Sequence, residues 1–81
     1  MKTTKDKRTA SNIGVTTGAT LWETGKHETT LYVKPNGSGY DWIMVSPKTG
    51  NHTVKQQGGL VPDMTERVKA HWDGFQKMQN R

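Results

Sequence analysis

The sequence contains no cysteine, which excludes a disulfide scaffold and a zinc site built on thiolates. It also lacks any apolar run near the roughly 20 residues that a membrane-spanning helix needs. The basic start is not followed by the apolar stretch that a secretion signal carries. We therefore expect a cytoplasmic protein with no membrane partner.

Hydrophobic residues are scarce, at 30% of the 81 residues, so the chain has the material for one modest core and one domain. We expect a flexible basic arm over residues 1–12 and a single small domain over residues 13–81. The net charge is +5, and much of it lies in the arm, on Lys2, Lys5, Lys7 and Arg8. Such an arm attracts polyanions, although a merely solubilising terminus is the alternative interpretation.

Runs of β-branched and aromatic residues predict an antiparallel meander between Thr29 and Lys55. Turn residues separate the runs, at Pro35–Gly39 and at Pro47–Gly50. A shorter run before the meander could form a hairpin with its first strand. The predicted strands are 19–23, 29–34, 40–45 and 52–55.

The register follows from the lengths assigned to these loops. With Pro35–Gly39 as a five-residue loop, Tyr32 pairs with Trp42 and Leu31 pairs with Ile43. With Pro47–Gly50 as the second loop, one face is aliphatic and carries Leu31, Val33, Ile43, Val45 and Val54. The opposite face carries the aromatic rings and two lysines, and its members are Thr30, Tyr32, Lys34, Tyr40, Trp42, Met44, Thr53 and Lys55. Asp41 falls on the aliphatic face, and a slip of one residue would exchange the two faces.

One amphipathic helix is predicted over residues 64–79, with Asp63 as its N-cap and Glu66 completing a capping box. Apolar residues recur along it at spacings of three and four, at Met64, Val68, Trp72, Phe75 and Met78. The expected fold is α+β, with a three- or four-stranded antiparallel β-meander whose aliphatic face packs on this C-terminal helix.

The aromatic face is the candidate site because aromatic rings with neighbouring lysines suit nucleic acid. Tyr32, Tyr40 and Trp42 would contact bases or sugars, while Lys34, Lys48 and Lys55 would contact phosphate. Alternatively, the rings are covered by residues such as Ile13, Val15 and Leu21, or by a second subunit in a homodimer.

The run LYVKPNGSGYDWIMVSPKTG, followed by a short strand and a helix, resembles the amino-terminal arm-binding domain of phage tyrosine integrases. The matching positions are Leu31, Tyr32, Val33, Lys34, Asn36, Gly37, Tyr40, Pro47, Lys48, Thr49 and Gly50. That family lays a three-stranded sheet in the major groove of DNA. The resemblance implies that Tyr32, Lys34, Tyr40, Trp42 and Lys48 face DNA, and it covers about half the chain.

We find no pattern that indicates an enzyme, a cofactor or a metal centre. His27, His52 and His71 match no ligand spacing, and no glycine cluster has the setting of a phosphate-binding loop. The sequence favours a small nucleic-acid-binding module that prefers DNA to RNA. The rival hypothesis is a small phage-type protein that binds a host protein through the same aromatic face, since Trp42 and Met44 suit a protein interface.

Overall fold

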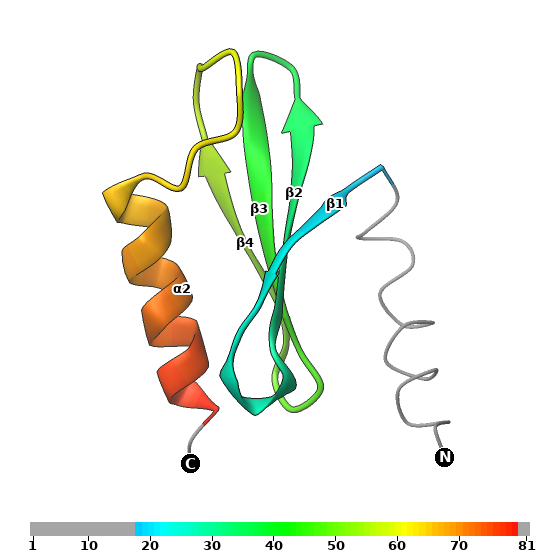
Figure 1. The fold of residues 1–81 in the computed structure, drawn as a ribbon, viewed down its shortest axis with the longest axis vertical. Coiled ribbons are helices and arrows are strands. Elements are labelled where there is room, and N and C mark those ends of the chain that lie inside the picture. The colour runs from blue at the N-terminus through cyan, green and yellow to red at the C-terminus, as the bar shows by residue number, and fades with distance from the viewer. Residues whose placement is uncertain (1–17, 80–81) are drawn as a thin grey trace.

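The computed structural model describes residues 18–79, and they form a four-stranded antiparallel sheet with one helix beside it (Figure 1). The strands follow one another in the order β1-β2-β3-β4. The elements are β1 (Thr20–Thr24), the 3₁₀ turn η1 (Lys26–Glu28), β2 (Thr30–Asn36), β3 (Gly39–Ser46), β4 (Gly50–Gln56) and α2 (Glu66–Met78). The predicted α+β meander is confirmed, while the predicted arm and the residues up to Thr17 lie outside the described part.

The β2–β3 turn is shorter than predicted, and this changes the register. Asn36 pairs with Gly39, which leaves only Gly37 and Ser38 between the strands. Gly37 has a φ of 63°, as the first central residue of a type II′ hairpin turn requires. Pro35 extends β2 at a point that β1 does not reach, so its missing N–H costs no ladder bond to β1.

As a result, Tyr32 pairs with Ile43 and Val33 pairs with Trp42, so the predicted register is wrong by one residue. The β3–β4 hairpin shifts in the same way, because Ser46 pairs with Gly50 and Trp42 with Val54. Gly50 takes a φ of 86° at the end of this three-residue loop. Asp41, which the predicted register placed on the aliphatic face, instead lies beside Lys34 and Lys55.

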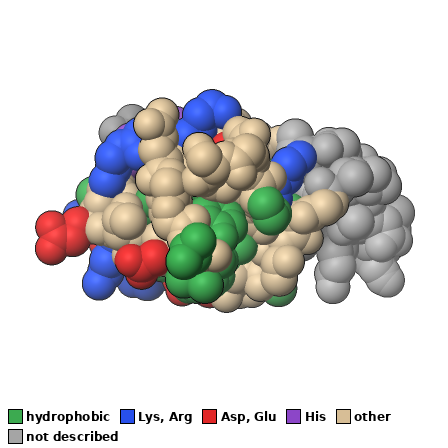
Figure 2. Space-filling model, turned by 90° about the horizontal axis from the view of Figure 1, so that it is seen from above, with side chains coloured by type: hydrophobic (Ala, Val, Ile, Leu, Met, Phe, Trp, Pro, Cys, Tyr) green, Lys and Arg blue, Asp and Glu red, His purple; other side chains and the backbone are tan. Residues whose placement is uncertain are grey.

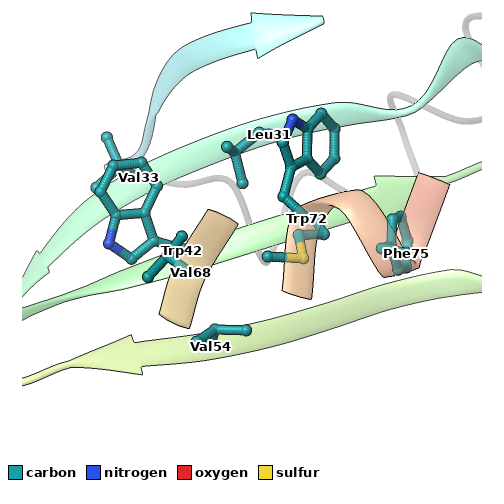
Figure 3. Packing of buried hydrophobic residues seen from close by; sticks show 8 residues of the cluster. Leu31, Val33, Trp42, Val54, Val68, Trp72 and Phe75 are labelled. Carbon is teal, nitrogen blue, oxygen red and sulfur yellow. The ribbon is translucent and has the colours of Figure 1, made fainter. Parts of the chain in front are cut away.

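The core lies between α2 and the face of the sheet that carries the odd-numbered residues of β2 (Figure 3). Its members are Leu31, Val33, Trp42, Met44, Val54, Val68, Trp72 and Phe75. Leu31, Val33 and Val54 face the helix, as predicted. Ile43 and Val45 were also predicted to face it, but they lie on the other face, and Trp42 and Met44 take their place in the core. Burying one tryptophan removes roughly 200 Å² from water, worth about 5 kcal/mol before entropy is counted. The fully buried Trp42 and Trp72 are therefore major contributors to stability.

The helix starts later than the capping-box pattern predicts. Thr65 is the N-cap, and its side chain accepts the N–H of Val68 at 3.3 Å. The segment before it stays non-helical while it crosses from the end of β4 to α2, so the predicted Asp63 cap is wrong. Met64 packs against the core from this segment, whereas Met78, predicted to be buried, is 52% exposed.

The first hairpin is irregular. A bulge lies between Leu21 and Glu23, and Glu23 pairs with Leu31. Trp22 lies on the helix side of the sheet, where its ring meets Trp42 edge-on at 4.9 Å. At the far end of the hairpin, the backbone N–H of Lys26 donates to Gln76 of α2 at 2.8 Å. The turn between β1 and β2 therefore docks on the helix, next to its C-terminal end (Figure 1).

Candidate functional site

The face of the sheet opposite α2, which we call the outer face, carries three cross-strand rows of side chains. In β2, β3 and β4 the rows are Lys34–Asp41–Lys55, Tyr32–Ile43–Thr53 and Thr30–Val45–Asn51. From β1, Leu21 pairs with Tyr32 and Thr24 pairs with Thr30, so these two residues extend the last two rows. Side chains alternate along each strand, so this face is set by the same register that places Trp42 in the core. Among residues 18–79, no helix packs on it.

Asp41 holds the first row together. Its carboxylate lies 3.6 Å from the Lys55 ammonium and accepts two contacts from the Asn36 amide, at 3.1 and 3.2 Å. Lys34 lies directly across from Asp41 in the ladder. One carboxylate between two ammonium groups leaves this row with one excess positive charge. The Lys55 side chain is 66% exposed, so the ion pair is screened by water and contributes little to stability.

Access to the outer face differs from strand to strand. Ile43 and Val45 on β3 are buried, while Tyr32 and Lys34 on β2 are half-buried. The β4 side chains of this face are exposed, and they are Asn51, Thr53 and Lys55. Hydroxyl, amide and ammonium groups of the two flanking strands are therefore the polar atoms that the face offers to a partner.

Three of the predicted site residues do not lie on this face. Trp42 is fully buried, and its Nε1 donates to Gln56 at 2.9 Å. Tyr40 is half-buried against the core, and its hydroxyl donates to the Leu60 carbonyl at 2.9 Å. Lys48 lies in the β3–β4 loop and donates to the Gln79 carbonyl at the end of α2, at 3.2 Å. The predicted cluster of three aromatic rings is therefore wrong in its geometry.

Tyr32, Lys34 and Lys55 are the predicted site residues that share the outer face. Lys2, Lys5, Lys7 and Arg8 lie outside the described residues. Thr30 and Thr53 lie on the face that the sequence predicted for them, although no contact was assigned to either. Sequence reasoning missed Asn51 on this face and the bridging role of Asp41. A two-residue turn at Gly37 and Ser38 and a three-residue loop before Gly50 would have revealed this, because together they pair Asp41 with Lys34 and with Lys55.

A second surface lies at the end of the sheet that carries the β2–β3 turn. Leu60 is 98% exposed and Val61 is 66% exposed, in the segment that follows β4. Beside Leu60 is an open hollow of about 450 Å³, which Pro35 and Tyr40 also line. Figure 2, which views the molecule from this end, shows hydrophobic side chains gathered there.

Within residues 18–79 no helix is long and apolar enough to cross a membrane. The same residues include no group of three or more histidine, aspartate or glutamate side chains placed to hold a metal ion. Comparisons with protein-family models, with curated proteins and with solved structures find no match to this chain. The resemblance to the integrase arm-binding domain thus gains no support from them and is not excluded by them.

Proposed function

We propose that this chain is a small nucleic-acid-binding module, preferring DNA, that contacts its target with the outer face of the sheet. The observation that carries the proposal is the grouping of Tyr32, Lys34 and Lys55 on the face turned away from α2. Among residues 18–79, the helix packs on the opposite face of the sheet and stabilises it from behind.

Charge supports a polyanionic target. The chain carries a net charge of +5, and the Lys34–Asp41–Lys55 row adds its excess charge to the face itself. The basic residues at the start of the sequence would supply further, sequence-independent affinity by releasing counterions from phosphates. Affinity for a duplex is therefore expected to fall steeply as salt rises.

The polar side chains of the outer face support recognition of the bases and sugars, in addition to the attraction that charge provides. Threonine, asparagine and tyrosine side chains reach base edges and sugars, while lysines fix the position of the sheet on phosphates. By resemblance to the integrase arm-binding domain, the sheet would enter the major groove, which is wide enough for β-strands. The contacts proposed for Tyr32, Lys34 and Lys55 fit that arrangement, whereas those expected of Trp42 and Tyr40 do not.

Binding to a fluorescent DNA duplex at several salt concentrations tests the proposal. Lys34→Ala should weaken binding and reduce the slope of log affinity against log salt by about 0.9 for one lost phosphate contact. Tyr32→Ala should weaken binding with little change in that slope. Lys69→Ala is the matched control, because Lys69 is an exposed lysine on α2, away from the outer face. Parental affinity and slope in both outer-face variants would exclude this surface as the binding site.

A protein partner is the second candidate, and the exposed Leu60 and Val61 favour it. Nucleic acid gives no reason to expose two neighbouring aliphatic side chains, whereas protein interfaces bury such residues at their centres. A nuclease-treated pull-down from the native host, repeated with Leu60→Ser, tests it. A partner that is retained by the parent and lost by the variant supports this candidate, and light scattering identifies a homodimer.

A further inference from the structure

Two histidines that lie far apart in the sequence meet where β4 borders α2. The ring centroids of His52 on β4 and His71 on α2 are 5.6 Å apart, with 32° between the ring planes. Both residues are exposed, and both line an open hollow of about 420 Å³ between the two elements. Spacing along the sequence gives no sign of this pair, because it depends on how the helix packs against the edge of the sheet.

The position of the pair is determined by packing beneath it. The His52 ring stacks on Phe75, with centroids 6.4 Å apart and 17° between the planes. Phe75 is 6% exposed and belongs to the core, so it supports one face of the His52 ring. His71 directly precedes Trp72, which is buried in the same core and orients this part of the helix. Two neighbouring core residues therefore hold the histidines near each other.

We propose that His52 and His71 form a two-ligand site for a divalent transition-metal ion, with water completing the coordination. A metal–nitrogen bond of about 2.1 Å places an imidazole centroid roughly 3.2 Å from the ion, so two imidazoles on a tetrahedral ion have centroids about 5 Å apart. The observed separation of 5.6 Å is close to this value, and exposed side chains can close the difference by small rotations.

No cationic side chain lines the hollow, so none repels a bound metal ion. The other residues that line the hollow are Thr49, Asn51, Ala70, Gly74, Phe75 and Met78, and none of them is charged. Imidazole ligands bind Cu²⁺, Ni²⁺ and Zn²⁺, with Cu²⁺ expected to bind most tightly. Since the described residues offer no third histidine or carboxylate to the site, the affinity should be modest. A bound ion would link the edge strand β4 to α2, and this effect is independent of the proposed nucleic-acid binding.

Calorimetric titration with CuCl₂, NiCl₂ and ZnCl₂, together with thermal unfolding in the presence and absence of each metal, tests the site. The parent chain should bind one equivalent and gain about 5 °C or more in Tm at metal concentrations well above Kd. His52→Ala and His71→Ala should each lose most of this gain.

His27→Ala is the matched control, since His27 lies in η1 and is not among the residues that line the hollow. It should keep the full metal-dependent rise in Tm. His52→Gln and His71→Gln retain a polar side chain and serve if an alanine variant unfolds. An unchanged rise in the His52 and His71 variants, or no rise in the parent at millimolar metal, would overturn the proposal and leave the pair as a ring contact only.

Discussion

Replacing Ser46 with alanine tests a buried polar network that joins the β3–β4 loop to the end of α2. The Ser46 hydroxyl donates to Oε1 of Gln79 at 2.6 Å and accepts the backbone N–H groups of Lys48 and Thr49, at 3.0 and 3.2 Å. Ser46 is 4% exposed and Gln79 is 1% exposed. The Gln79 amide also donates to the Phe75 carbonyl at 2.9 Å, which satisfies the last turn of the helix.

The cost of Ser46→Ala follows from the groups that it leaves without partners. A buried acceptor without a donor costs about 1–3 kcal/mol, and Oε1 of Gln79 retains only the Thr49 hydroxyl, at 3.4 Å. The N–H groups of Lys48 and Thr49 belong to exposed residues, so water can replace part of what they lose. We expect a loss of about 2 kcal/mol in unfolding free energy, or roughly 8–16 °C in Tm for a domain of this size.

A double-mutant cycle with Gln79→Ala makes the test specific. Urea unfolding of the parent, the two single variants and the double variant should give a coupling energy of about 1 kcal/mol or more, because the two side chains contact each other directly. Ser38→Ala, at an exposed serine in the β2–β3 turn, should change stability by less than about 0.5 kcal/mol. Single-variant losses that add to within about 0.3 kcal/mol would refute the idea that the hydroxyl and the amide stabilise each other.

Three further changes test the packing by urea or thermal unfolding. Gly39→Ala should destabilise by about 2 kcal/mol or more, because a Cβ there would overlap the carbonyl oxygen of Gln56 in the neighbouring strand, and a parental Tm would contradict the register. Gly74→Ala should instead stabilise by about 1 kcal/mol, since the added methyl meets nothing within 4 Å and glycine weakens a helix interior. Trp72→Phe should cost about 1–2 kcal/mol, because it removes packing and the indole hydrogen bond to Glu23 at 2.7 Å; Glu23→Gln, which keeps an acceptor, should cost less.

The elements themselves were predictable because their signals are local. Alternating β-branched and aromatic residues specify β2 and β3, and the spacing of Val68, Trp72 and Phe75 specifies the buried side of α2. The start of the helix was less predictable, because two candidate caps lie two residues apart. Asp63 fits the sequence pattern, but Thr65 is the residue whose side chain accepts the N–H of Val68 at the start of the helix.

The faces of the sheet were harder to predict than the elements, because they depend on whether each turn contains an odd or an even number of residues. Interpreting Pro35 as part of a loop adds residues to the turn and moves the β3 side chains to the other face. The extra residue assigned to the β3–β4 loop shifts the register once more, which returns the β4 side chains to the correct face. The chain contains a signal against the interpretation of Pro35 as a loop residue. The longer loop places Asp41 among aliphatic residues, whereas the two-residue turn, together with the three-residue β3–β4 loop, places it between Lys34 and Lys55, where its charge is paired.

The corrected register also changes the balance between the two proposed functions. The argument for a protein partner at the sheet depended on Trp42 and Met44, which suit the centre of an interface, but both are fully buried under α2. Apart from Leu21 of β1, which is 53% exposed, the outer face presents hydroxyl, amide and ammonium groups beside Tyr32. Nucleic acid accepts such polar groups more readily than a dry protein interface does. The case for a protein partner therefore moves to Leu60 and Val61, at one end of the sheet. Because these residues are not on the outer face, a Leu60 variant and a Lys34 variant can separate the two functions in a single chain.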